Sequence, residues 1–155
     1  MRTMSRLFIA VSLSEGVIKN LVRVQDDLRR QLPGWRWMQP DTLHLTLKFL
    51  GDVPIDLVHE ACVLADEAVE EIEPFEFRLQ GLGVFPDIAR AKVLWAGLAG
   101  EWEPLAEIAQ RLEQSASELG LRPEPKPFRP HVTLARADRR EADAEGLAPV
   151  LQAYA

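Results

Sequence analysis

Two kinds of hydrophobic pattern alternate along this chain. Short apolar runs, and one run in which apolar and polar residues strictly alternate, are typical of β-strands. Longer stretches with apolar residues three and four positions apart indicate amphipathic helices. Strands are predicted over 6–11, 43–50, 75–79, 92–98 and 131–136, and helices over 15–31, 56–72, 101–119 and 138–151. This order predicts an α+β fold in which helices cover one face of mostly antiparallel sheets.

The residues between these elements predict several boundaries. Ser14 is a suitable N-cap for the first helix, and Pro33-Gly34 ends it. The strictly alternating strand is expected to place Leu45, Leu47 and Phe49 on one face and His44, Thr46 and Lys48 on the other. Gly51-Asp52 is expected to close this strand. The stretch 81–90, which contains glycines and a proline, is expected to form a loop.

The composition predicts one globular domain in a reducing compartment. A chain of 155 residues, 47% of them hydrophobic, can form a stable core without metals or disulfides. The single cysteine, Cys62, cannot form an intramolecular disulfide, and no apolar run approaches the roughly 20 residues of a membrane span. We therefore expect a cytoplasmic protein with no membrane partner. The net charge of −6 argues against a protein that coats nucleic acid, but it permits a local basic pocket for one phosphate.

The same short motif occurs twice. His44-Leu45-Thr46-Leu47 and His131-Val132-Thr133-Leu134 each place a threonine two residues after a histidine, in a chain that has three histidines. Residues i and i+2 of a strand lie on the same face, so each imidazole is expected beside its own hydroxyl, and the aliphatic residues are expected to pack into the sheet. Two such strands side by side would form a small cleft with a hydrophobic floor.

Two imidazoles in one cleft suit acid–base chemistry at phosphorus. Because the ordinary pKa of histidine is about 6.5, one ring can act as the acid and the other as the base in one displacement. The threonine hydroxyls can donate hydrogen bonds to nonbridging phosphate oxygens. The imidazolium and nearby cations can balance the phosphate charge, so we expect no metal and no other cofactor.

These histidines could have two other uses. Either histidine alone would more often be structural, but two unrelated core histidines have no reason to share the same neighbours. Zinc needs three or four ligands. The third histidine, His59, lies on the charged second predicted helix without companions at ligand spacing, and we expect it at the surface.

At these residues the sequence resembles the 2H phosphoesterase superfamily, which is named for two His-x-Thr/Ser motifs. Within it, the sequence is similar to the bacterial and archaeal RNA 2′,3′-cyclic phosphodiesterases, historically called 2′-5′ RNA ligases. The segments that follow the family pattern are 6–10, 43–51, 81–86 and 128–136. The resemblance implies a bilobal α+β fold with pseudo-twofold symmetry, antiparallel sheets that line a central groove, and helices outside. Residues 1–155 would form a single domain of two lobes, without the strands that family members usually add after the last helix.

The resemblance also implies an activity and a role for each motif residue. Family members open a 2′,3′-cyclic phosphate at the end of an RNA to a 2′-phosphate. In that reaction His44 would be the proton donor and His131 the proton acceptor. Thr46 and Thr133 would hold the phosphate oxygens. Phe49 and Arg136 match positions near the nucleoside, and Arg129 and Lys48 are further candidate cations for the phosphate.

The resemblance therefore predicts a monomeric, metal-independent enzyme whose partner is an RNA with a cyclic phosphate end. Three alternatives stay open. The same fold could act on a small cyclic nucleotide or on a cyclic phosphate of ADP-ribose. It could be an inactive module that binds RNA ends, which the intact motifs disfavour. A hydrolytic site could also run in reverse and join RNA halves through a 2′-5′ linkage when a hydroxyl replaces water.

Overall fold

The chain folds into two compact units, each assembled from separated segments. The structure is a computed structural model, and it describes residues 3–137 and 144–155. The first unit comprises Met1–Val11, Thr46–Phe77 and Gly100–Pro130, and the second comprises Ser12–Leu45, Arg78–Ala99 and His131–Ala155. Both motif histidines therefore belong to the second unit.

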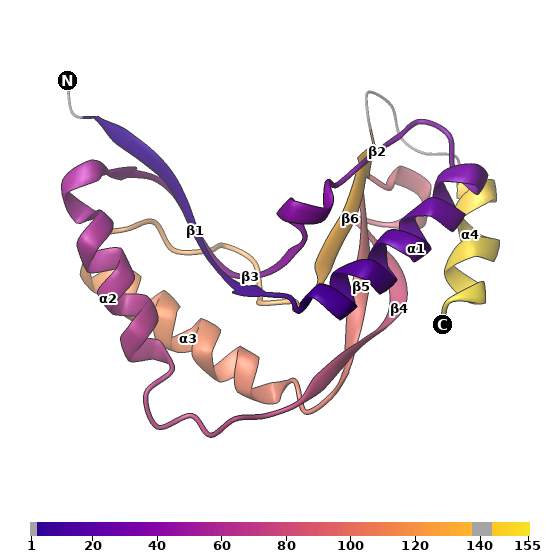
Figure 1. The fold of residues 1–155 in the computed structure, drawn as a ribbon. Helices are drawn as coiled ribbons and strands as arrows, with labels where there is room; N and C mark the ends of the chain where they lie inside the picture. The colour runs from indigo at the N-terminus through magenta and orange to yellow at the C-terminus, as the bar shows by residue number, and fades with distance from the viewer. Residues whose placement is uncertain (1–2, 138–143) are drawn as a thin grey trace. The chain divides into compact units, whose positions relative to one another are not determined.

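The first unit packs helices against a pair of strands (Figure 1). β1 (Met4–Ser12) pairs with β3 (His44–Pro54), and α2 (Val58–Ala68) and α3 (Glu103–Glu118) lie side by side against them. A 3₁₀ turn, η2 (Ile55–Leu57), leads from β3 into α2. The buried core residues include Leu50, Val53, Ala61, Ala116, Ala68, Ile108 and Leu112. Removal of these aliphatic side chains from water holds the helices on the strands.

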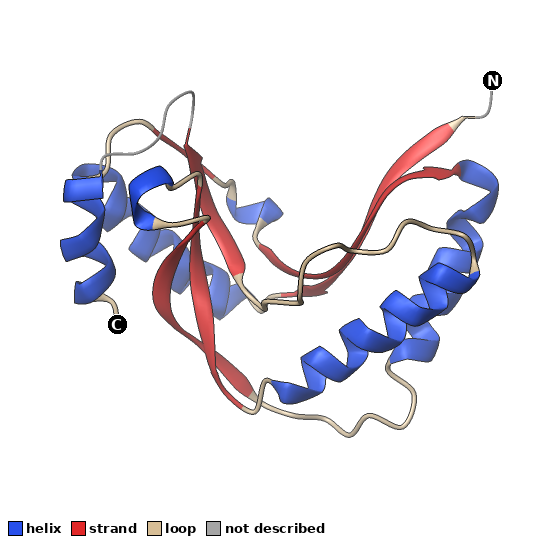
Figure 2. Ribbon diagram, turned by 180° about the vertical axis from the view of Figure 1, so that it is seen from behind, coloured by secondary structure: helices blue, strands red, loops and turns tan. Residues whose placement is uncertain are grey.

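The second unit is a sheet with helices on one face (Figure 2). β6 (Val132–Ala137) lies inside this sheet, with β5 (Val93–Gly100) and then β4 (Phe77–Phe85) on one side. On its other side β6 pairs with β2 (Trp35–Trp37) and with the start of β3. η1 (Pro40–Thr42) lies between β2 and β3, and η3 (Ile88–Arg90) between β4 and β5. Side chains of α1 (Glu15–Gln31) and α4 (Ala144–Ala153) share a buried cluster with the sheet, which includes Leu28, Leu147, Leu94 and Ala135.

The predicted α+β class is confirmed. β2, β3 and β5 all pair antiparallel with β6, and helices cover the buried face of the sheet. α1 has the predicted bounds, because the Ser14 hydroxyl accepts a hydrogen bond from the Val17 backbone N–H at 3.3 Å and so caps the first turn. The last predicted helix is confirmed from Ala144 onward, and its earlier part, 138–143, lies outside the described residues.

Two predicted strand ends are wrong, because both strands continue through glycine. β3 passes through Gly51 and ends at Pro54, and β4 extends into the first half of the stretch 81–90 predicted as a loop and ends at Phe85. The reason in β4 is close packing. A Cβ on Gly83 would lie 2.2 Å from two ring carbons of Trp95, so the indole lies directly on the backbone there. This glycine marks a close approach inside a strand and does not mark a turn.

α2 is shorter than predicted and ends at Ala68 instead of residue 72. Arg111 of α3 donates hydrogen bonds to the carbonyls of Ala68 at 3.3 Å and Glu70 at 2.8 Å. These bonds give partners to carbonyl groups at and just after the end of the helix, where no further helical N–H is available. Glu71 follows with a φ of 63°, which regular helix does not allow. The acidic residues of the run 67–73 also lie at the negative C-terminal end of the helix dipole, which destabilises a longer helix.

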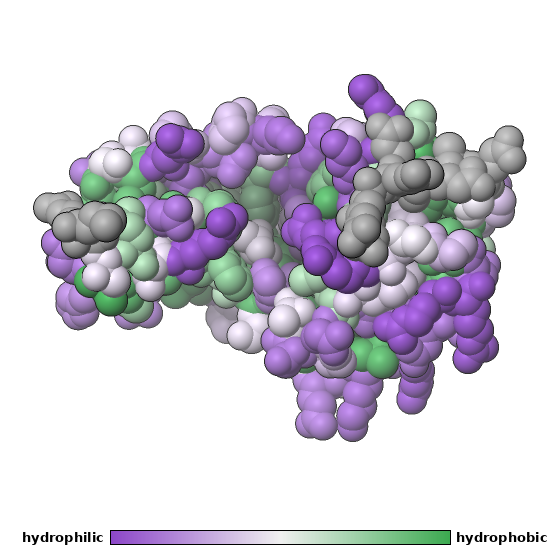
Figure 3. Space-filling model, turned by 90° about the horizontal axis from the view of Figure 1, so that it is seen from above, coloured by the Kyte–Doolittle hydropathy of each residue, from purple (hydrophilic) through white to green (hydrophobic). Residues whose placement is uncertain are grey.

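The surface mixes polar and apolar groups. Figure 3 shows hydrophilic residues (purple) over much of one face, with apolar areas (green) between them. Such a mixture is ordinary for a chain in which 27% of the residues are charged. Among the described helices, none has the length and apolar character needed to span a bilayer.

We predict that Gly83→Ala lowers the free energy of unfolding by roughly 1–3 kcal/mol, because the new methyl group must displace the Trp95 indole. Chemical denaturation measures this loss. Gly16→Ala is the matched control, since no atom lies within 4 Å of a Cβ on that helical glycine. It should raise stability by roughly 0.5 kcal/mol. Equal effects of the two substitutions would contradict the close packing.

Candidate active site

The two histidine–threonine motifs lie on neighbouring strands. β3 and β6 run antiparallel with Leu45 opposite Val132. This register places His44, one residue before Leu45, across from Thr133, one residue after Val132. Leu45 and Val132 are fully buried, so His44 and Thr133 lie on the other face of the sheet, where both are half-buried. The structure thus brings residues of both motifs together on one face of the second unit.

The other two motif residues follow from the same strands. His131 directly precedes Val132, and Thr46 directly follows Leu45. Both are half-buried. By strand alternation, Thr46 shares a side of β3 with His44, and His131 is the residue immediately before β6. Thr46 is the first residue of a segment of the first unit, whereas the other three motif residues belong to the second.

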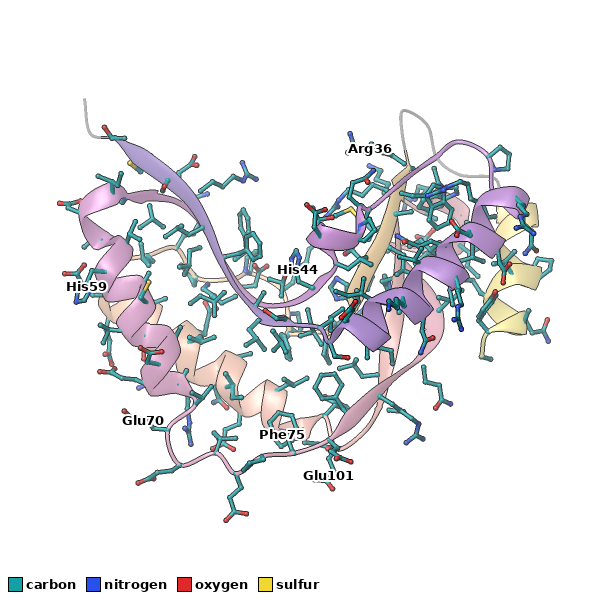
Figure 4. All side chains as sticks on the ribbon, in the orientation of Figure 1. Arg36, His44, His59, Glu70, Phe75 and Glu101 are labelled. Atoms are coloured by element: carbon teal, nitrogen blue, oxygen red, sulfur yellow. The ribbon has the colours of Figure 1, made fainter. Side chains whose placement is uncertain are left out.

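The turn η1 orients the imidazole of His44 (Figure 4). The chain leaves β6 after Met38, whose N–H donates to the Leu134 carbonyl at 2.9 Å, and it pairs with β6 again at Leu45. Between these points, Nδ1 of His44 lies 2.6 Å from the carbonyl oxygen of Thr42. Because a carbonyl oxygen only accepts hydrogen bonds, Nδ1 carries a hydrogen. Nε2 is therefore the nitrogen that can exchange a proton with a substrate.

Aromatic rings pack around His131. Phe85 meets the imidazole edge-on, with ring centroids 5.0 Å apart and planes at 89°. The Trp95 ring lies 6.1 Å from the imidazole and 5.0 Å from Phe85. The backbone of Gly83 lies against the same indole. These contacts restrict the orientation of the His131 ring, which a proton-transfer group requires.

A bulge in β6 determines which of its side chains face this site. Trp95 of β5 lies opposite Thr133, and the residue before Trp95 lies opposite Ala135, so Leu134 is an extra residue in β6. Leu134 and Ala135 are both fully buried, whereas Thr133 is not. His44, Thr133 and Trp95 consequently form a row across β3, β6 and β5.

Gln25 of α1 binds β6 and the segment between β2 and η1, and the sequence interpretation missed it. Its side chain is 2% exposed, and its Nε2 donates to the carbonyls of Leu134 at 3.0 Å and Met38 at 3.1 Å. The amide therefore binds the bulge of β6 and the point where the chain turns away into η1. A signal was present, because Gln25 lies between Leu21 and Leu28 on the apolar side of the helix. A polar residue at such a position is expected to have buried hydrogen-bond partners.

Lys48 is not available to a phosphate, so its candidate role is wrong. It is 3% exposed, its Nζ lies 2.8 Å from Oε2 of Glu113, and it donates to the Arg122 carbonyl at 3.2 Å. The ion pair compensates for the burial of the ammonium group. Burial acts to raise the pKa of Glu113, but the hydrogen bonds from Lys48 and the Glu124 N–H, with the charge of Lys48, outweigh it and lower the pKa.

Phe49 is exposed, which corrects the face predicted for it. The burial pattern of β3 departs from strict alternation at Lys48, and Phe49 is 42% exposed instead of packing beside Leu47. The guanidinium of Arg6 lies 5.1 Å from the centroid of the Phe49 ring. Phe8, on the same strand as Arg6, is 49% exposed. An exposed ring beside a guanidinium is a suitable surface for stacking a base.

The remaining candidate residues are at the surface. Arg136 is exposed on β6, and Arg129 is exposed two residues before His131. His59 is exposed on α2, as predicted (Figure 4). Among the described side chains, those of residues 3–137 and 146–155, no group of three or more His, Cys, Asp or Glu side chains is placed to hold a metal ion.

Known proteins are similar to this chain in both sequence and fold. The sequence model described as LigT like Phosphoesterase matches residues 11–95 and 99–155. The chain is 38% identical over 153 residues to a Thermus thermophilus protein named RNA 2′,3′-cyclic phosphodiesterase, covering 94% of this chain and 74% of that protein. A protein of the same name from Methanothermobacter thermautotrophicus is 33% identical over 131 residues, covering 84% of this chain and 70% of that protein.

Solved structures of two proteins are similar to the fold of this chain. The protein TT0787 of Thermus thermophilus superposes with a TM-score of 0.78 and 35% identity, covering 86% of this chain and 75% of that chain. LigT of E. coli complexed with 3′-AMP superposes with a TM-score of 0.73 and 27% identity, covering 91% of this chain and 77% of that chain.

We predict that Gln25→Met lowers the free energy of unfolding by roughly 1–3 kcal/mol, because the buried carbonyls of Met38 and Leu134 lose a donor. Denaturant unfolding measures the change. Gln31→Met is the control, since the Gln31 amide donates to a carbonyl of the same helix in an exposed position. Its cost should stay below about 0.5 kcal/mol. Equal costs would contradict a special role for Gln25.

The lowered pKa of Glu113 predicts a specific pH dependence. A carboxyl whose pKa is lower in the folded state stabilises the fold above its unfolded pKa of about 4.3, and this contribution is lost as the pH falls through the folded value. Glu113→Gln should therefore lose less stability than the wild type on acidification below about pH 4. Thermal unfolding across this range measures the difference. Glu118→Gln, which removes an exposed carboxyl from the end of the same helix, is the control; an identical response of both variants would refute the assignment.

Proposed function

Because the chain belongs to the LigT-like phosphoesterase family, we propose that it hydrolyses RNA-terminal 2′,3′-cyclic phosphate to a 2′-phosphate. The observation that carries the proposal is the register of β3 against β6, which sets His44 of one motif across from Thr133 of the other. Residues directly across an antiparallel pair have Cβ atoms about 5 Å apart, and diagonal neighbours about 7–8 Å. An imidazole and a hydroxyl at such spacing can reach the same phosphate group. The names of the similar proteins supply the substrate class.

The proposed reaction is a displacement at phosphorus. A water molecule attacks the phosphorus and gives its proton to His131, while the bond from phosphorus to the 3′ oxygen breaks. His44 donates a proton to that oxygen, so the product has a 3′ hydroxyl and a 2′-phosphate. The donor and acceptor roles follow the family resemblance. The hydrogen bond from Nδ1 of His44 to the Thr42 carbonyl supports proton donation from Nε2.

The threonines and the exposed cations bind the substrate in this proposal. The hydroxyls of Thr46 and Thr133 donate to the nonbridging oxygens, on which negative charge is held during the displacement. Phe49 stacks on the terminal base. Arg136 and Arg129 supply positive charge near the nucleotide. We place Thr46 in the site because it follows His44 by two residues in the same strand. The paired imidazoles supply both the acid and the base, so the proposed mechanism needs no metal.

A small cyclic nucleotide is the second candidate substrate. The similar E. coli LigT was solved in complex with 3′-AMP, a mononucleotide. A site of this kind would act on the cyclic phosphate and one nucleoside, without requiring a longer RNA. Turnover of a cyclic mononucleotide and of a cyclic-ended oligonucleotide, compared under the same conditions, distinguishes the two.

We predict that His44→Ala and His131→Ala each lower kcat on a cyclic-ended oligonucleotide by at least about 100-fold, because each removes one proton-transfer group. The product of the wild type should carry the phosphate on the 2′ oxygen, which position-specific product analysis establishes. A chelator should leave the rate unchanged. His59→Ala, which alters an exposed histidine on α2, should keep the wild-type rate.

Two results would refute the mechanism. One is undiminished turnover by either motif variant. The other is a product that carries the phosphate on the 3′ oxygen, because then the 2′ oxygen would be the leaving group. Binding of the cyclic-ended RNA without product formation by the wild type would instead indicate an inactive RNA-end binding module.

A further inference from the structure

Two arginines face each other across β2 and β6. The antiparallel register of these strands pairs Arg36 directly with Arg136. Both side chains are exposed. Like charges directly opposite each other destabilise a pair of strands, so this position carries an electrostatic cost that the fold itself does not explain. The sequence interpretation did not single out Arg36.

Both guanidinium groups lie on the open face of the sheet. Trp35 and Trp37, which flank Arg36, pack into the cluster beneath α1 and α4. Ala135, which precedes Arg136, packs into the same cluster. Strand alternation therefore directs both arginines away from these helices, to the face that carries Thr133. In Figure 4 the labelled Arg36 and His44 lie on the side of β6 that is turned away from α4.

No described carboxylate balances this positive charge. The ion pairs among the described side chains, those of residues 3–137 and 146–155, include neither Arg36 nor Arg136. On the other side of β6, the residue opposite Arg136 is the apolar Val93. The whole chain carries a net charge of −6, so a concentrated pair of cations on one face is a local feature. A bound anion would remove the repulsion between the two guanidinium groups.

The distance from the motif suits a polynucleotide. Arg136 follows Thr133 by three residues along β6, which is about 10 Å of strand or less, because the bulge lies between them. A guanidinium presents paired donors that match two oxygens of one phosphate group. A cyclic mononucleotide has no second phosphate to place there, whereas an oligonucleotide has one at each internal linkage.

We propose that Arg36 and Arg136 form a binding site for an internal phosphodiester of the RNA, upstream of its cyclic end. This inference rests on the proposed function and extends it, because it makes a polynucleotide the preferred substrate class. Arg36 supplies the second half of the site, and Arg136 binds the phosphate chain in addition to its place near the nucleotide. Specificity for RNA over a mononucleotide would then depend on β2 as well as on the motif strands.

The test compares kcat/KM for two substrates in Arg36→Gln and Arg36→Glu. One substrate is a pentanucleotide with a 2′,3′-cyclic phosphate end, and the other is 2′,3′-cyclic AMP, which has no internal phosphodiester. The ratio of kcat/KM for the pentanucleotide to that for cyclic AMP should fall about 10-fold in Arg36→Gln and further in Arg36→Glu. The slope of log kcat/KM against log salt for the pentanucleotide should also become shallower by about one.

Arg23→Glu is the matched control, because it makes the same change in net charge at an exposed position of α1 in the same unit. It should keep the wild-type substrate ratio. An equal ratio in Arg36→Glu and Arg23→Glu overturns the proposal. If Arg36→Glu does not fold, Arg36→Gln decides the question by the same ratio.

Binding separates this inference from the proposed function. A fluorescent pentanucleotide that ends in a 2′-phosphate should bind Arg36→Gln at least about fivefold more weakly than the wild type, as fluorescence anisotropy measures. If the wild type opens no cyclic end, the proposed function fails, yet this loss would still support the phosphate site. Unchanged affinity in Arg36→Gln would overturn the phosphate site even if the wild type is active.

Discussion

The antiparallel register of β3 against β6 is the constraint on which the candidate site depends. Leu45 and Val132 lie opposite each other and are fully buried, so the two-residue period of a strand directs their neighbours, His44 and Thr133, to the other face. A shift by one residue would turn polar motif side chains into the apolar core, where they would lose hydration. The aliphatic residues of the motif therefore select the face on which its histidines and threonines appear.

The bulge at Leu134 resolves a conflict within β6. In a regular strand, Thr133 and Ala135 would share one face, yet Ala135 belongs to the buried cluster beneath the helices and Thr133 lies opposite Trp95 on the open face. One extra residue lets the strand satisfy both requirements. The Leu134 carbonyl accepts hydrogen bonds from the Met38 N–H and from Gln25 Nε2, so the irregular backbone is fixed by a helix of the core. The same bulge therefore satisfies both the packing of the core and the geometry of the candidate site.

The sequence predicted what short-range rules determine. A Ser14 cap and regular apolar spacing define α1, and the repeated motif locates the two central strands without any knowledge of their pairing. The wrong predictions occur where a contact with a residue far away in the sequence determines the local structure. Gly83 was predicted in a loop because the sequence does not show that the Trp95 ring packs on its backbone. Lys48 was predicted on the polar face of an alternating strand, but it is buried because it pairs with Glu113 of α3. Gln25 is polar on an apolar helix face because its partners are backbone carbonyls from two distant segments.

The charge distribution is consistent with action at an RNA end. A net charge of −6 repels RNA as a whole, so affinity must come from a few local contacts that are strong enough to overcome the general field. Exposed Phe49 beside Arg6, and Arg36 across from Arg136, are the contacts that we propose for this role, each within a single unit. Because the net field repels RNA, RNA segments that do not reach these local contacts would bind weakly. In this proposal the net negative charge disfavours general binding of RNA, and the local cations supply the affinity for the RNA end.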